Sequence, residues 1–154
     1  MTAPAIGDTL PDFELPATGN QNIALSALRG QSVVLFFYPK ASTPGCTKEG
    51  QQFRDLHAQF VAANAVVLGI SRDGVKAQEN FKAKQGFPYE LLSDKEEQVC
   101  NLFDVIKMKN MYGKQVRGIE RSTFLIDAQG VLRQAWRKVK VDGHAQAVLD
   151  ALTD

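Results

Sequence analysis

Two apolar runs dominate the hydrophobic pattern of this chain. Residues 31–38, QSVVLFFY, and residues 64–71, NAVVLGIS, are rich in β-branched and aromatic side chains and show little polar alternation. Runs of this kind are typical of strands buried on both faces of a sheet. Residues 123–127 and 131–136 predict two further strands joined by a turn over 127–130.

Segments with helical periodicity lie between and after these predicted strands. Phe53, Leu56 and Phe60 recur at the spacing of one helix face, which predicts a helix over about 45–62. Three more helices are expected: one near 74–85, one after a Ser93/Asp94 cap with Val99, Leu102 and Phe103 turned inward, and one over 143–152. A hairpin is expected within 13–25. The pattern indicates an α/β fold around a mostly buried sheet, and a length of 154 residues fits a single domain, 1–154.

Composition and charge narrow the function classes. The chain is 44% apolar and 23% charged, as in ordinary soluble globular proteins. A formal net charge of +1 gives no indication of a nucleic-acid or membrane partner, and the run VVLFFY is far too short to span a bilayer. The N-terminal residues lack the basic start and apolar region of a secretory signal, so a cytoplasmic protein is expected.

The cysteines and histidines exclude several kinds of site. Cys46 and Cys100 form no CxxC pair, which argues against a disulfide scaffold and suits a reducing compartment. His57 and His144 lie far apart, and no Cys/His spacing resembles a zinc site. We expect neither a metal nor a cofactor, and we expect His144 to lie on the surface.

Cys46 stands where the loop 39–45 turns into the predicted helix. Backbone N–H groups in a first helical turn lack intrahelical partners and carry the positive end of the helix dipole, which favours a thiolate. Pro44 and Gly45 leave amide groups facing the sulfur, and Thr43 supplies a hydroxyl three residues earlier. The alternative is that Cys46 is a small buried apolar residue.

A nucleophilic Cys46 would have no histidine base. His57 lies eleven residues along the same helix, roughly 16 Å away at 1.5 Å per residue, and is expected to be solvated or half-buried. A Cys–His hydrolase is therefore disfavoured. A thiolate with hydrogen-bonding support but no base suits attack on a weak O–O bond.

At this point the motifs resemble a known family. The segment from Pro39 to Cys46, PKASTPGC, matches the PxxxTxxC pattern of peroxiredoxins, and FFYPKASTPGCTKEGQQFRD is similar to the bacterioferritin-comigratory-protein or PrxQ subfamily. GDTLPDFELP near the start and MYGKQVRGIERSTFLID at 111–127 also resemble that subfamily. The resemblance implies a thioredoxin-like fold, with a central mixed sheet flanked by helices and an N-terminal β-hairpin extension, and a thiol-dependent peroxidase.

The resemblance also implies roles for individual residues. Cys46 matches the peroxidatic cysteine, which attacks hydrogen peroxide or an organic hydroperoxide and becomes a sulfenic acid. Thr43 matches the residue that binds the peroxide, and Pro39 the one that shields the sulfenic acid. Arg121 matches the arginine that stabilises thiolate and transition state. Glu49 either complements the helix N-terminus and orients Arg121, or lies in solvent.

The chain departs from the subfamily pattern in its second cysteine. Gln51 stands where many members have a resolving cysteine, and residues 75–85 contain none. Cys100 is then either a core residue, a resolving thiol or the site of an intermolecular disulfide. The leading hypothesis is a monomeric one-cysteine enzyme reduced by thioredoxin, glutaredoxin or a small thiol. Gly50 would weaken the helix by roughly 1 kcal/mol and so ease unwinding around the oxidised sulfur.

Two questions stay open from the sequence. The basic stretches at 107–121 and 137–140 are either solvated faces or a surface that receives an acidic reductase. The alternative function is a non-catalytic thioredoxin-fold redox sensor or client-binding protein, which would keep a reactive Cys46. Thr43 and Arg121 argue against this alternative, because a slow sensor does not need them.

Overall fold

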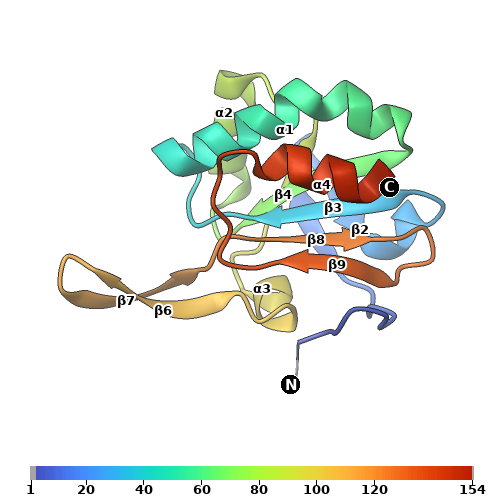
Figure 1. Cartoon of the computed structure of the whole chain (residues 1–154). Helices are drawn as coiled ribbons and strands as arrows, with labels where there is room; N and C mark the ends of the chain where they lie inside the picture. The colour runs from blue at the N-terminus through green and yellow to red at the C-terminus, as the bar shows by residue number, and fades with distance from the viewer. Residues whose placement is uncertain (1–2, 154) are drawn as a thin grey trace.

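A seven-stranded mixed sheet forms the centre of the structure, a computed structural model that describes residues 3–153 (Figure 1). The strands are β1 (Glu14–Ala17), β2 (Gln21–Ala24), β3 (Ser32–Phe37), β4 (Ala65–Ser71), β5 (Glu90–Ser93), β8 (Ser122–Ile126) and β9 (Leu132–Trp136), in the order β2-β1-β5-β4-β3-β8-β9. Strands β3, β4 and β5 run parallel, whereas β8 pairs antiparallel with β3. The expected central mixed sheet is therefore confirmed.

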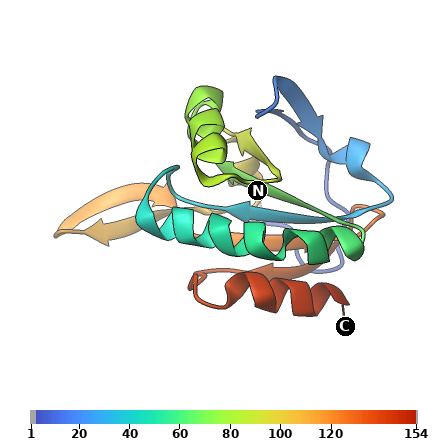
Figure 2. The same cartoon turned by 90° about the horizontal axis from the view of Figure 1, so that it is seen from above.

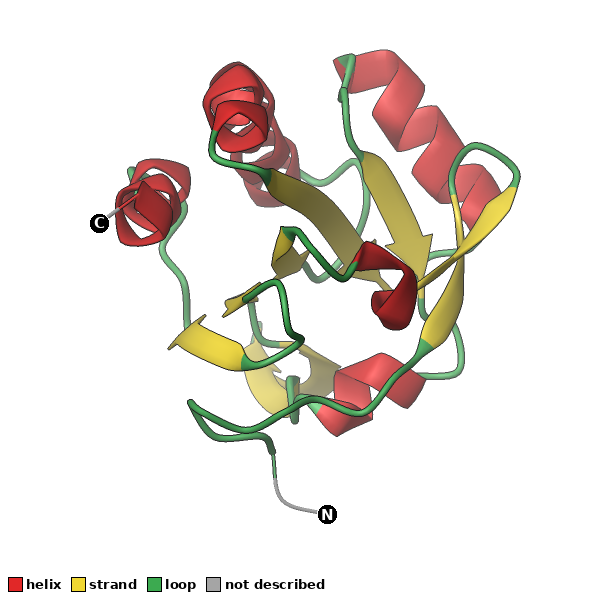
Figure 3. Ribbon diagram, turned by 90° about the vertical axis from the view of Figure 1, so that its right-hand side faces the viewer, coloured by secondary structure: helices red, strands yellow, loops and turns green. Residues whose placement is uncertain are grey.

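Helices cover both faces of this sheet. Three helices, α1 (Pro44–Ala62), α2 (Val75–Gln85) and α4 (His144–Thr153), lie on one face, with α4 beside α1 (Figures 1 and 2). The short helix α3 (Gln98–Leu102) and the 3₁₀ helix η1 (Leu25–Leu28) lie on the other. Figure 3 shows the layers from the side, with α4 at one end of the helical layer.

Each face of the sheet has its own hydrophobic core. Alternate side chains of a strand point to opposite faces, so β3 contributes to both cores. Phe36 and Tyr38 pack under α1, α2 and α4, whereas Leu35 and Phe37 pack on the side of α3. The continuous apolar run of β3 is thus explained by burial on both sides.

Most of the expected elements are confirmed within one or two residues at each end. These are the four strands predicted from apolar runs, the helices at 45–62, 74–85 and 143–152, and the early hairpin formed by β1 and β2. Phe36 and Phe37 lie in the core, as the apolar pattern predicts.

The expected Ser93/Asp94 helix cap is wrong. Ser93 is the last residue of β5, and the Asp94 N–H donates to the Ser71 carbonyl, so the parallel ladder with β4 uses these residues. The helix begins at Gln98, after Glu97 at φ 62°. Asp94 still accepts a hydrogen bond from the backbone N–H of Cys100, which lies within that helix, at 2.7 Å.

A two-stranded arm was not expected from the sequence. Strands β6 (Ile106–Met111) and β7 (Lys114–Ile119) form a two-stranded sheet of their own, separate from the central sheet among the described residues, and project beyond the body of the molecule (Figures 1 and 2). Their turn holds Tyr112 at φ 53° and Gly113 at φ 80°, the conformation that two-residue hairpin turns require. We call residues 106–119 the β6–β7 arm.

Candidate active site

Polar contacts within the loop before α1, and one to Asp73 after β4, hold that loop in place. The Thr43 hydroxyl donates to the Lys40 carbonyl at 2.7 Å, and the Ala41 N–H donates to Asp73 at 2.8 Å. Thr43 is the N-cap residue of α1, and its carbonyl accepts the first helical bond from Thr47. Cys46 therefore lies in the first turn of α1, where backbone N–H groups lack intrahelical partners.

Sheet register brings Arg121 to this turn. In the antiparallel pair β3–β8, Ser122 lies opposite Phe37, so Arg121 lies beside the end of β3 from which the loop to α1 departs. The Arg121 carbonyl accepts a bond from the Val139 N–H at 3.0 Å, which holds its backbone. Residues far apart in the sequence thus meet at the carboxyl end of β3.

Arg121 joins the thiol and a carboxylate. Its Nη2 lies 3.5 Å from Sγ of Cys46, and its Nη1 donates to Oε1 of Glu49 at 2.6 Å. Gly45 makes this approach possible, because a Cβ at that position would lie only 3.1 Å from Nη2. The structure therefore brings Gly45, Cys46, Glu49 and Arg121 into one contact set.

Glu49 lies inside the protein, with 1% of its surface exposed. Burial raises the pKa of Glu49 to about 7, although the adjacent Arg121 opposes this shift. Its second oxygen, Oε2, has no hydrogen-bond partner among the described residues. Of the two sequence interpretations, the orienting contact with Arg121 is the one observed, and exposure to solvent is wrong.

Cys46 is both buried and in contact with a cation. Only 2% of its surface is exposed, and it packs in the core under α1. A guanidinium keeps its charge and offers fixed N–H donors, so it stabilises a thiolate and an oxyanion that leaves nearby. The arrangement can therefore support nucleophilic attack by sulfur on a bond whose leaving group becomes negative.

Thr43 and Pro39 lie on the rim of this site. Both are half-buried; Thr43 is the N-cap residue of α1, and Pro39 follows the buried Tyr38, the residue after β3. A hollow of about 280 Å³ opens beside Pro39, and its lining is Pro39, Lys40, Arg72, Asp73, Lys95 and Glu97, so it borders the loop without including Cys46.

Lys109 of the arm adds a second cation that the sequence did not single out. Its ammonium donates to the Ile119 carbonyl, two residues before Arg121. Burial lowers the pKa of Lys109, and the neighbouring Arg121 lowers it further while Cys46 raises it. The sequence signal available for β6 was the alternation of apolar and polar residues over 106–111, IKMKNM, followed by the turn residues Tyr112 and Gly113.

His144 is not the surface residue that was expected. It is buried beside α1, and its Nε2 lies 2.8 Å from the Thr123 hydroxyl. Burial lowers the pKa of His144 to about 4, so the ring is neutral at pH 7. The physical reason is that α4 packs its first turn onto β8 and α1, which a local sequence pattern does not reveal.

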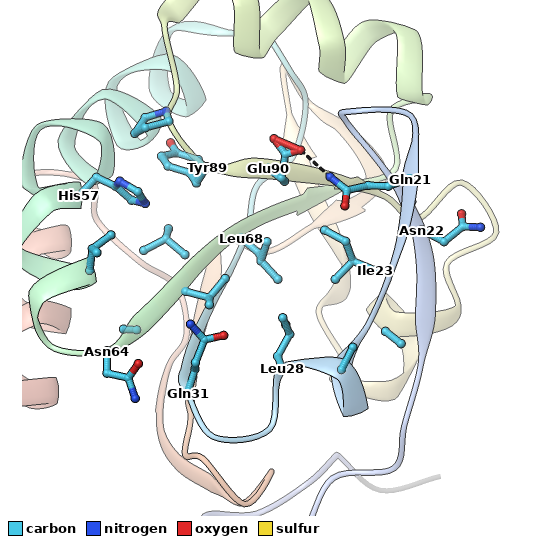
Figure 4. Close-up of a pocket in the computed structure, with 17 residues that line it drawn as sticks. Gln21, Asn22, Ile23, Leu28, Gln31, His57, Asn64, Leu68, Tyr89 and Glu90 are labelled. Atoms are coloured by element: carbon cyan, nitrogen blue, oxygen red, sulfur yellow. Dashed lines mark hydrogen bonds between the residues drawn. The ribbon is translucent and has the colours of Figure 1, made fainter.

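A second concave region lies away from Cys46. It measures about 500 Å³ and lies between β2, β4 and the C-terminal half of α1, with His57 and Tyr89 at one side (Figure 4). His57 is half-buried, as expected, and burial lowers its pKa. Glu90 in this region bonds Gln21 and Lys82. The region contains no thiol, so it is not part of the site around Cys46.

Cys100 lies on the opposite face of the sheet from Cys46. It is a fully buried residue of α3, and both cysteines are free. Burial raises the pKa of the Cys100 thiol, and the adjacent Asp94 raises it further. Within residues 3–153 no cluster of His, Cys, Asp or Glu is placed to hold a metal ion, and no helix is long and apolar enough to cross a membrane.

Comparisons with known proteins agree with this geometry. The model of the AhpC/TSA family matches residues 6–135. Peroxiredoxin Bcp of Xanthomonas campestris is 57% identical over 92% of this chain and 88% of its own length, and that of Bacillus subtilis is 46% identical over 97% and 95%.

Solved structures show the same likeness. A cysteine-to-serine variant of Xylella fastidiosa PrxQ superimposes with a TM-score of 0.94 at 48% identity, covering 99% of this chain and 98% of that one. Peroxiredoxin Q of Xanthomonas campestris gives 0.87 at 57% identity, with 92% and 89% covered. The expected thioredoxin-like fold is therefore confirmed, and the chain belongs to the AhpC/TSA family, among the peroxiredoxins of the Bcp or PrxQ type.

Proposed function

We propose that Cys46 is the peroxidatic cysteine of a thiol peroxidase that reduces hydrogen peroxide and organic hydroperoxides. The observation that carries this proposal is the Arg121 guanidinium at 3.5 Å from Sγ of Cys46, in the first turn of α1. A solved structure of the Xanthomonas campestris bacterioferritin comigratory protein addresses the alkyl peroxide reduction activity of that protein, and this relative supports the same substrate class here.

The reaction needs no base. The Cys46 thiolate attacks the nearer peroxide oxygen, the O–O bond breaks, and its electron pair leaves with the distal oxygen as an alkoxide or hydroxide. That oxygen takes a proton to give the alcohol or water, and the sulfur is left as a sulfenic acid. Arg121 stabilises first the thiolate and then the departing oxygen.

Three further residues complete the proposed site. The Thr43 hydroxyl, which donates to Lys40 when no substrate is present, rotates to bond the peroxide. Pro39 limits water access to the sulfenic acid. Glu49 positions the guanidinium by accepting a hydrogen bond from Nη1.

We further propose that an external thiol restores Cys46. Cys100 lies in the core on the far side of the sheet, and a disulfide needs Cα atoms within about 7 Å of each other. Thioredoxin, glutaredoxin or a small thiol then supplies the reducing equivalents. The proposed enzyme is a cytoplasmic monomer that consists of a single domain.

Two serine variants test the assignment. We expect Cys46→Ser to abolish peroxide consumption, because no other described thiol lies beside Arg121. Cys100→Ser keeps a full single turnover, because that thiol takes no part in the attack on peroxide. Rapid mixing with peroxide, followed by Trp136 fluorescence, measures both. Peroxidase activity in Cys46→Ser would refute the assignment, and a slow reaction of the wild type would favour a redox sensor.

A further inference from the structure

We propose that the β6–β7 arm is the docking surface for the protein thiol that reduces oxidised Cys46, and that this partner presents an acidic surface. The proposal rests on the function proposed above and identifies the face of the molecule that the reductant uses. Three observations carry it: the charge of the arm, its exposed apolar side chains, and its continuity in sequence with Arg121, which contacts the Cys46 thiol.

The arm is strongly basic in a chain that is nearly neutral. It holds four of the 18 Lys and Arg residues and none of the 17 Asp and Glu residues. The four are Lys107, Lys109, Lys114 and Arg117. Lys107 pairs with Asp104 and Arg117 with Glu97, both outside the arm, whereas Lys114 is exposed beside the turn. Basic and acidic surfaces attract at long range, so such an arm favours encounter with an acidic partner.

Apolar side chains lie among these charges. Met108, Tyr112 and Val116 are 60%, 100% and 40% exposed, and they are three of the five large hydrophobic side chains exposed within the described residues. Tyrosine and methionine are enriched in protein–protein interfaces, where an apolar centre is surrounded by polar groups. Their concentration on one projecting arm indicates a contact surface.

The arm is directly connected to the site around Cys46. Strand β7 ends at Ile119, two residues before Arg121, and Lys109 of β6 bonds the Ile119 carbonyl. The arm and the N-terminal end of α1 lie at the same end of the molecule (Figures 1 and 2). A partner seated on the arm therefore holds its thiol close to the turn that carries Cys46.

A neighbouring segment extends the same charge. Residues 137–140, RKVK, run beside the arm, because the Val139 N–H bonds the Arg121 carbonyl and Lys138 lies in one hollow with Lys107 and Met108. Lys138 and Lys140 are exposed. A second copy of this chain would bring an equally basic arm, so charge selects against arm-to-arm pairing and for an acidic protein.

The chemistry at this surface balances. A thiolate of the partner attacks the Cys46 sulfenic acid, a mixed disulfide forms, and water leaves with the sulfenic oxygen. A second thiol of the partner then attacks the partner's first sulfur in the mixed disulfide. This releases Cys46 as a thiolate and leaves the partner oxidised to an internal disulfide. Two partner thiols are therefore oxidised for each peroxide reduced.

The test compares an arm variant with a matched variant elsewhere. The arm variant is Lys114→Glu with Tyr112→Ser. The control is Lys84→Glu with Val61→Ser, which makes the same charge change and also removes one exposed hydrophobic side chain. Val61 lies roughly 22 Å along α1 from Cys46 at 1.5 Å per residue, and Lys84 is in the last turn of α2, the helix that packs on β5 and β1.

Three assays are run on each protein: a single turnover with hydrogen peroxide, steady-state turnover with dithiothreitol, and steady-state turnover with reduced thioredoxin, its reductase and NADPH. We expect the arm variant to raise the KM for thioredoxin roughly tenfold, with a weaker dependence on salt, because surface charges act mainly on association. Its single turnover and its dithiothreitol rate stay at the wild-type level, and the control matches the wild type throughout.

Equal thioredoxin kinetics in the arm variant and the control would overturn the docking proposal. So would a wild type that turns over with dithiothreitol but not with thioredoxin, or an arm variant that loses its single turnover as well. A wild type whose Cys46 does not react with peroxide refutes the proposed function itself, so the two failures are distinguishable.

Discussion

At the scale of single residues, the site depends on one guanidinium that two acidic groups share. Arg121 contacts the Cys46 sulfur through Nη2 and the Glu49 carboxylate through Nη1. The two acceptors compete for the same positive charge. The Glu49 carboxylate and the Cys46 sulfur therefore contact different nitrogens of the same cation.

The raised pKa of Glu49 gives a prediction about stability and pH. Folding moves this pKa from 4.5 to about 7, so the folded state binds the proton more tightly than the unfolded state. The resulting stabilisation is complete below pH 4.5 and is lost as the pH rises through 7. We expect the free energy of unfolding of the wild type, relative to Glu49→Gln, to fall by on the order of 2 kcal/mol between pH 5 and 8.

Urea denaturation of both proteins across this pH range checks the prediction. Glutamine keeps the size of the side chain and does not ionise, so the difference between the two proteins isolates Glu49. The titration of His144 is common to both proteins and cancels in the difference. A difference that does not change with pH would contradict the prediction.

At the scale of elements, α1 carries the thiol and is packed closely where it does so. A Cβ at Gly50 would lie 2.4 Å from Cζ of Phe87, and the Gly50 carbonyl accepts a bond from the Tyr89 hydroxyl at 2.7 Å. The sequence suggested that Gly50 loosens the helix. The structure adds that the glycine lets an aromatic cluster approach α1 one turn after Cys46.

Gly50→Ala is therefore expected to destabilise the protein. Alanine usually favours a helix over glycine by about 1 kcal/mol, but the clash with Phe87 outweighs this gain and leaves a net loss of about 1–3 kcal/mol. In a Phe87→Leu background the same change should cost less, because the ring is no longer there. Chemical denaturation of the two single variants and the double variant measures this coupling. Additive effects would show that Phe87 is not the cause.

The β6–β7 arm is the element that the sequence did not predict. An isolated two-stranded hairpin is marginally stable in water, so its formation depends on what it contacts at its base. Ile119 is fully buried, and Arg117 pairs with Glu97 at the start of α3. Both Arg117 and Arg72 hold the pKa of Glu97 at about 2, well below its usual range, so this link stays charged at neutral pH.

At the scale of the whole molecule, the sheet separates the two cysteines. Cys46 belongs to the core under α1, α2 and α4, whereas Cys100 belongs to the core on the side of α3. Bringing the two sulfurs together would require one of the helices to leave its face of the sheet. The fold therefore favours reduction of Cys46 by a thiol from outside the chain.

This separation predicts the products of oxidation. After one equivalent of peroxide without a reductant, mass spectrometry should find a sulfenic acid at Cys46, trapped by dimedone, and a reduced Cys100. The matched control is Cys100→Ser, which should give the same adduct yield. An intramolecular disulfide between Cys46 and Cys100 would contradict the one-cysteine mechanism.

The sequence by itself determined the features that depend on near neighbours. The strands follow from apolar runs, α1 follows from the spacing of Phe53, Leu56 and Phe60, and the environment of Cys46 follows from its place in a first helical turn. These depend on backbone geometry and side-chain periodicity, which act over a few residues. The resemblance of Pro39, Thr43, Cys46 and Arg121 to a family motif supplied the remaining part of the predicted site.

Only the tertiary structure decided which distant residues meet. Arg121 reaches Cys46 across 75 positions because β8 pairs with β3 in one register, and His144 is buried because α4 packs onto that strand. The position of Cys100 on the far face and the projection of the arm depend likewise on strand order. Pairing register and packing are set by the summed burial of the whole chain, so no local pattern contains them.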